Sequence, residues 1–107
     1  MRTFEHPPRE AFQLDAVLSA LADPVRRFIA WRLFELSPRG CAEIELPVSK
    51  STATYHYRVL REAGIIWQHY QGTAIMNVLR RDDLEARFPG LLDAVFTAER
   101  ATRTSAP

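Results

Sequence analysis

The sequence is poor in residues that build covalent or metal-stabilised frameworks. It contains one cysteine, Cys41, among 107 residues. A single thiol can form neither an internal disulfide framework nor a zinc site made of several thiolates. A reducing environment suits such a composition, and we therefore expect a cytoplasmic protein.

Long apolar runs are also missing. No stretch approaches the roughly 18 apolar residues of a candidate membrane span. The first ten residues contain acids, a histidine and two prolines and have no apolar core, so we expect no secretory signal there. The sequence has no glycine-rich phosphate loop, no nucleophile motif and no carboxylate pair with a supporting base. We therefore expect neither an enzyme nor a bound cofactor.

Lysine is nearly absent, because Lys50 is the one lysine among 14 basic residues. The formal net charge is only +1, but the charges are unevenly placed. Residues 49–81 contain five basic side chains and a single acid, Glu62. The local potential governs the encounter with a charged partner, so this segment predicts an anionic one.

The remaining composition is that of an ordinary globular domain, with 47% hydrophobic and 25% charged residues. Apolar residues at helical spacing predict helices over residues 10–22 and 24–36. Asp23 and Pro24 suit the cap and the first position of the second helix. Between Cys41 and Val48 the apolar residues alternate, and Pro47 disfavours helix, so we expect a short or distorted helix there.

A strongly marked helix follows from Lys50 to Ala63. Ser49 can cap its start, and Gly64 stands where a helix end needs a positive φ. Two runs rich in β-branched and aromatic residues, 65–70 and 73–79, flank Gly72 and predict a β-hairpin. A short helix over 82–88 and a last helix after Pro89 complete the chain.

This order of elements predicts a mainly α fold with a minor β component: a winged helix-turn-helix of about five helices with a two-stranded β-hairpin wing. We expect a flexible arm over residues 1–9, the domain over 10–101 and a disordered tail over 102–107. A helix of this kind fits the major groove of duplex DNA, and a hairpin can lie along the backbone.

Two blocks of the sequence resemble the ArsR/SmtB-type bacterial repressors. Leu21 to Arg27 (LADPVRR) is similar to the family's L-[AS]-D-P-x-R opening. Val48 to Ile66 (VSKSTATYHYRVLREAGII) is similar to its recognition helix. The blocks occur in the family's order and distance, and the resemblance covers residues 10–98. It implies a cytoplasmic homodimer that binds double-stranded operator DNA and represses transcription, with the first and last helices paired across the two-fold axis.

The sequence departs from the metal-sensing members of that family. The expected third helix offers Cys41 alone, and the last helix offers Asp93 and Glu99 without a histidine. The spacing of the three histidines does not resemble a zinc motif. We therefore expect no metal site. Cys41 remains open between a redox-active thiol and a small buried residue.

The residues expected to act fall into two groups. The DNA-binding group lies on the capped helix and the hairpin tip: Ser49, Lys50, Ser51, Thr54, Tyr55, Arg58, Arg61, Gln71 and Thr73. The dimer group lies on the end helices: Phe12, Leu14, Val17, Leu18, Leu92, Val95 and Phe96.

An ordinary solvated polar helix face would show the same pattern as the DNA-binding group. The alternative function is accordingly a winged-helix protein–protein interaction module without specific DNA readout. The operator, the regulated genes and any effector do not follow from the sequence.

Overall fold

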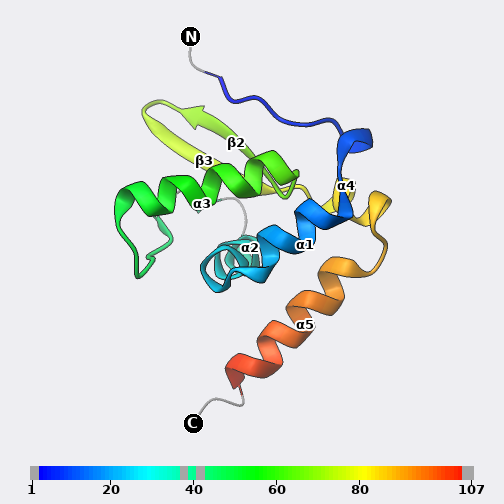
Figure 1. Ribbon diagram of the computed structural model, residues 1–107. Coiled ribbons are helices and arrows are strands. Elements are labelled where there is room, and N and C mark those ends of the chain that lie inside the picture. The colour runs from blue at the N-terminus through cyan, green and yellow to red at the C-terminus, as the bar shows by residue number, and fades with distance from the viewer. Residues whose placement is uncertain (1–2, 37–38, 41–42, 105–107) are drawn as a thin grey trace.

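The computed structural model describes residues 3–36, 39–40 and 43–104. Its elements are helices and short strands: α1 (Leu14–Ala22), α2 (Pro24–Leu36), β1 (Arg39–Gly40), α3 (Lys50–Ala63), β2 (Ile66–Gln71), β3 (Ala74–Leu79), α4 (Arg81–Arg87) and α5 (Leu91–Thr104). The β2–β3 hairpin lies against one side of α3, and α5 extends away from the hairpin on the far side of α1 and α2 (Figure 1). The mainly helical winged fold is therefore confirmed.

A single hydrophobic core joins the helices to the base of the hairpin. Buried side chains come from α1, α2, α3, the hairpin and α5, and those of Val17, Leu33, Leu60 and Ile66 have no exposed surface. Each such side chain contributes roughly 1.5–3 kcal/mol relative to an exposed one. The core thus fixes the position of α3 in the domain.

Asp23 caps α2 as expected. Its Oδ1 accepts hydrogen bonds from the backbone amides of Val25 (2.8 Å) and Arg26 (3.1 Å). Partial burial acts to raise the pKa of Asp23, but these amides and the nearby cations outweigh it, and the pKa lies below its ordinary value. The ionised carboxylate is thereby favoured at the helix start.

The predicted limits of α3 are confirmed by local chemistry at both ends. Ser49 Oγ accepts a hydrogen bond from the Thr52 amide at 3.2 Å. Gly64 ends the helix with φ +91°, and its amide donates to the carbonyls of Arg61 and Leu60. A Cβ on Gly64 would overlap the ring of Phe12, so two separate constraints require glycine here.

The hairpin is antiparallel, with Ile66 opposite Leu79 at its base and Gly72 in its turn at φ +65°. A further strand that the sequence did not predict, β1, pairs with β3, which gives the order β1-β3-β2. Strand β3 is therefore central, and β2 has a free edge.

The helix expected over residues 41–48 is not observed in the described part of that segment. Residues 43–49 run irregularly, and only Ile44 is buried. Pro47 lacks an amide donor and restricts the preceding residue to extended conformations, which opposes a helix. Cys41 lies outside the described residues, and the question of its redox activity therefore stays open.

The last helix is longer than expected. It continues to Thr104, so residues 102–104 of the predicted tail are helical. Arg103 pairs with Glu99 at 2.9 Å one turn earlier, and Thr102 Oγ1 donates to the carbonyl of Ala98. These bonds extend the helix beyond its apolar face.

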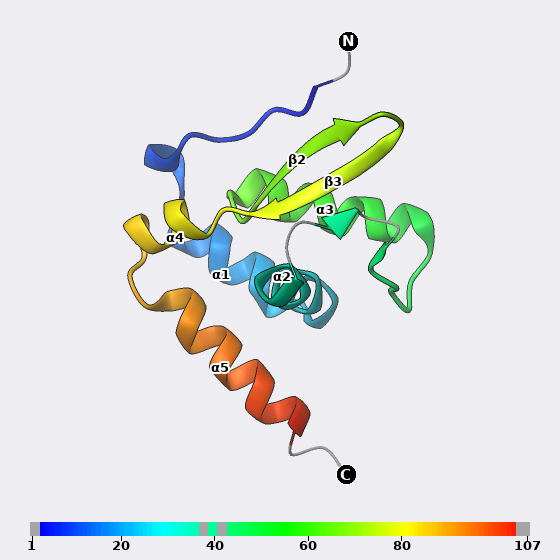
Figure 2. The same cartoon turned by 180° about the vertical axis from the view of Figure 1, so that it is seen from behind.

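The N-terminal arm lies along the free edge of β2 (Figure 2). Phe4 stacks on Tyr70 at 5.0 Å, and His6 stacks on Trp67 at 3.8 Å between ring centroids. The backbone amide of Gln68 donates to His6 Nε2 at 2.8 Å. Where a flexible arm was expected, the structure places a segment that covers the exposed edge strand.

Candidate nucleic-acid interface

Helix α3 has one face in the core and one in solvent. His56, Tyr57, Leu60 and Ala63 are buried. The opposite face carries five of the predicted DNA contacts, all exposed, at spacings of three and four residues: Lys50, Ser51, Thr54, Tyr55 and Arg58. The helix therefore presents a continuous row of hydrogen-bonding side chains outside the core.

Tyr55 and Arg58 form the C-terminal end of this row. The Tyr55 side chain is 49% exposed, and the Arg58 guanidinium lies 5.5 Å from its ring centroid. An exposed guanidinium can contact guanine O6 and N7 with two parallel hydrogen bonds. Thr54 Oγ1 donates to the Lys50 carbonyl at 3.0 Å, which leaves its oxygen free to accept.

Arg61, which was also predicted to bind DNA, has a different environment. Its Nη1 donates to Gln68 Oε1 at 2.6 Å, and its guanidinium lies 4.9 Å from the ring centroid of Phe4. Gln68 Nε2 in turn donates to Asn77 Oδ1 at 2.8 Å, and both amides are buried. Arg61 thus connects α3 to the wing and the arm.

The wing tip is formed by exposed polar residues. Gln71 and Thr73 flank Gly72 and are both exposed. The turn projects away from the helices (Figure 1), and both side chains are open to solvent. Their predicted role requires this accessibility.

The three histidines lie in separate environments. His56 is buried, with Nδ1 3.2 Å from Arg26 Nη1, whereas His6 rests on Trp67. Within the described ranges, no three His, Cys, Asp or Glu side chains are grouped closely enough to hold a metal ion. Glu99, one of the family's possible ligand positions, is buried and pairs with Arg27 and Arg103.

The predicted dimer residues divide into two sets. Phe12, Val17, Leu92 and Phe96 are buried within the core of the single chain. On α1, Leu14 (45% exposed) and Leu18 (44%) remain at the surface. A groove of about 330 Å³ between α1 and α5 is lined in part by Leu18 and the half-buried Val95. These three residues are the part of the predicted set that the fold leaves accessible.

Sequence reasoning missed the role of the arm and of Arg80. Trp67 is 45% exposed, and its ring contacts both the His6 ring and the Arg80 guanidinium, which lies 5.3 Å from the ring centroid. Arg80 Nη1 also donates to the Pro7 carbonyl at 2.7 Å. Pro7 and Arg80 lie 73 positions apart in the sequence, and no local pattern reports a contact over such a distance.

Among the comparisons with known proteins, only the comparison of structures finds similar proteins. No family model and no curated protein sequence matches the chain. The crystal structure of an ArsR family transcriptional regulator superposes with a TM-score of 0.63 at 23% identity, covering 87% of this chain and 98% of the other. An ArsR-like transcriptional regulator from Rhodococcus sp. RHA1 gives a TM-score of 0.62 at 22% identity, over 85% and 87% of the two chains.

The chain has the ArsR-type winged-helix fold. The structural likeness covers 87% of the chain in the first case and 85% in the second. No helix in the described residues is both long and apolar enough to cross a membrane.

Proposed function

We propose that this chain is a sequence-specific DNA-binding regulator of transcription. The observation that carries the proposal is the exposed row on α3, from Lys50 to Arg58, on a helix whose other face is fixed in the core. The ArsR-type fold supports it, because both similar structures are described as transcriptional regulators. The protein would then act in the cytoplasm.

In this proposal the exposed row of α3, from Lys50 to Arg58, enters the major groove. Arg58 and Tyr55 meet base edges, while Lys50, Ser51 and the capped helix start meet phosphates. Gln71 and Thr73 at the wing tip contact the neighbouring backbone. Arg61 holds the wing in place and contributes to phosphate binding only through its charge.

We further propose that the regulator is a homodimer acting as a repressor. The exposed Leu14 and Leu18 and the groove beside Val95 supply an apolar surface on α1 and α5 that water would otherwise cover. A two-fold dimer would place its recognition helices on half-sites about 34–36 Å apart. Repression follows if the bound dimer overlaps the promoter.

The test is a fluorescence-anisotropy titration of the purified protein. The duplex is the sequence upstream of the protein's own gene, with a scrambled duplex of equal composition as control, at several salt concentrations. We expect tighter binding to the upstream duplex, and log K should fall with log salt by about 0.9 for each phosphate contact.

Arg58→Ala should cost about 1–3 kcal/mol of binding free energy and relax specificity. The matched control is Arg100→Ala, which removes the same charge from the exposed face of α5. Equal losses in both variants, or equally weak binding to both duplexes at low salt, would contradict the proposal and favour the protein-interaction module.

A further inference from the structure

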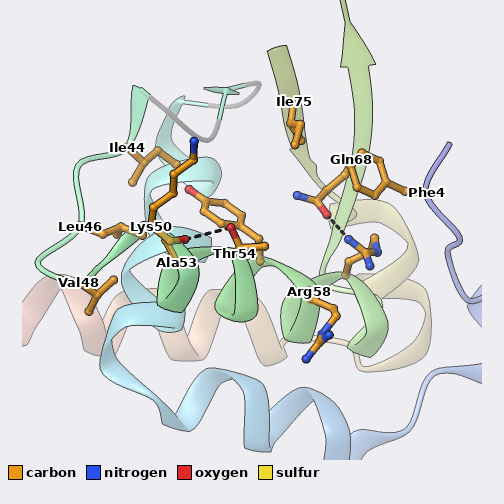
Figure 3. Close-up of a pocket in the computed structure, with 12 residues that line it drawn as sticks. Phe4, Ile44, Leu46, Val48, Lys50, Ala53, Thr54, Arg58, Gln68 and Ile75 are labelled. Atoms are coloured by element: carbon orange, nitrogen blue, oxygen red, sulfur yellow. Dashed lines mark hydrogen bonds between the residues drawn. The ribbon is translucent and has the colours of Figure 1, made fainter. Parts of the chain in front are cut away.

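A cavity of about 550 Å³ lies beside the recognition helix. It is bounded by the irregular segment 43–48, by α3 and by the wing, and three residues of the exposed row, Lys50, Thr54 and Arg58, line it (Figure 3). Volumes of this size are typical of sites for small organic ligands. The cavity lies beside residues 43–48, part of the segment where a short or distorted helix was expected.

The walls of the cavity are mostly apolar. Ile44, Leu46 and Val48 line it from the irregular segment, Ile75 from β3 and Phe4 from the arm. Of these five, only Ile44 is buried. A ligand with an apolar body would remove this surface from water, which favours binding.

The charged lining has one sign. Lys50, Arg58 and Arg61 line the cavity, and no acidic side chain does so among the described residues. In Figure 3 Arg58 directs its guanidinium away from the cavity, whereas Lys50 extends along its side near Ile44. Arg61 is bonded to Gln68, and Lys50 has no ion-pair partner within the described ranges. Lys50 is therefore the cation available to a ligand.

We propose that this cavity binds a small organic acid with an apolar body and a carboxylate head. The body packs against Ile44, Leu46 and Ile75, and the carboxylate accepts a charge-assisted hydrogen bond from the Lys50 ammonium. Because the lining is cationic and contains no acid, the anion binds more tightly than a neutral molecule of the same shape.

Such a ligand also acts on the surface proposed for DNA, and this second step rests on the proposed function. Lys50 and Thr54 line the cavity and belong to the exposed row of α3. A bound carboxylate neutralises the positive charge of Lys50 where a phosphate would approach. Acid and operator therefore compete, and the acid releases the protein from DNA.

The acid is tested first on the free protein, without DNA. Calorimetric titrations use 1-naphthoate and decanoate, with the neutral 1-naphthamide and 1-decanol as their matched controls. We expect saturable binding of one acid per chain, at least tenfold tighter than its neutral counterpart. Absence of saturation by both acids at millimolar concentration, or equal affinity for acid and neutral counterpart, would overturn the proposal.

Two variants locate the site. Ile75→Trp fills the cavity from the wing and should abolish binding, whereas Met76→Trp, at the next position on the opposite face of β3, should retain it. Lys50→Gln should lower the affinity for the acid about tenfold and leave that for the neutral molecule unchanged. Unaltered acid binding in both Ile75→Trp and Lys50→Gln would place the ligand elsewhere and overturn the assignment.

The link to DNA is measured separately, by adding the acid to the complex with the upstream duplex. The apparent Kd for DNA should rise in proportion to acid concentration in the wild type and stay constant in Ile75→Trp. Binding of acid by a protein that fails to bind DNA supports the cavity and contradicts the proposed function. Binding of both at once, with independent affinities, would overturn the competition.

Discussion

Arg61 Nη1 donates a 2.6 Å hydrogen bond to Gln68 Oε1, which joins the last turn of α3 to the first half of strand β2. Gln68 continues the connection to Asn77 on β3. The angle between helix and wing is thus set by side-chain bonds as well as by the short chain through Gly64. A protein that reads DNA with both elements needs this angle to be fixed.

Arg61→Ala should therefore destabilise the domain. The variant leaves Gln68 Oε1 without its charged donor, and the loss of such a bond costs about 1.5–3 kcal/mol. Chemical denaturation followed by circular dichroism measures the change in unfolding free energy.

Arg58→Ala is the matched control for that experiment, since it removes the same side chain one turn earlier on the exposed face. We expect its unfolding free energy to stay within about 0.5 kcal/mol of wild type, although its DNA binding falls. Equal stability of the two variants would show that Arg61 is no structural link.

The limits of α3 were predictable because caps are local chemistry. Ser49 and Gly64 act on amides and carbonyls within four residues, and both appear in the sequence as signals. The Arg61–Gln68 bond spans seven positions across a turn, and His6 meets Gln68 across 62 positions. Contacts of that kind depend on the folded chain, and no periodicity reports them.

Helix α1 shows a different reason for incomplete prediction. Leu14, Val17, Leu18 and Leu21 have the spacing of one apolar face, and Leu14, Val17 and Leu18 were all expected in the dimer interface. In the structure Val17 and Leu21 are buried, while Leu14 and Leu18 are exposed. A stripe of this spacing covers a wide arc, so its two edges can face different surroundings. The spacing of apolar residues identifies such a face, but it does not show which residues of the face are buried in the core and which stay exposed.

Gly64 and Gly72 allow two costs of an alanine substitution to be compared, the cost of backbone conformation and the cost of overpacking. Both have positive φ, but a Cβ would meet Phe12 at Gly64 and open space at Gly72. Gly72→Ala should cost about 1–2 kcal/mol from its conformation alone. Gly64→Ala should cost a further 1–3 kcal/mol or so from overpacking. Equal melting temperatures for the two variants would contradict the close approach of Phe12.

The docked arm should respond to pH through His6. Partial burial, followed by the charges of Arg80 and Arg61, lowers the pKa of the His6 imidazole. The neutral ring accepts the Gln68 amide bond at Nε2, and protonation removes that acceptor. A depressed folded pKa means that the unfolded chain binds the proton more readily, so the stabilisation is complete above the unfolded pKa, about 6.5. It declines as the pH falls from there towards the folded pKa.

His6→Phe isolates this contribution, because a phenyl ring retains the stacking on Trp67 but does not titrate. Unfolding free energies measured between pH 8 and pH 5 should decrease more steeply for the wild type than for the variant. Parallel pH profiles would show that His6 protonation is not coupled to folding.

The exposed leucines of α1 lead to a prediction about the proposed homodimer. Leu18 is 44% exposed beside the groove that Val95 lines, and a charge there would be buried in a dimer built on α1 and α5. Leu18→Glu should shift the protein from dimer to monomer in sedimentation velocity, since an unpaired buried carboxylate costs several kcal/mol in each of two symmetric positions. Thr97→Glu adds the same charge to an exposed position of α5 and serves as the control. Because Leu18 lies outside the core, the monomeric variant should keep its helical circular dichroism signal. A dimer that persists in Leu18→Glu would show that the two copies meet through another surface.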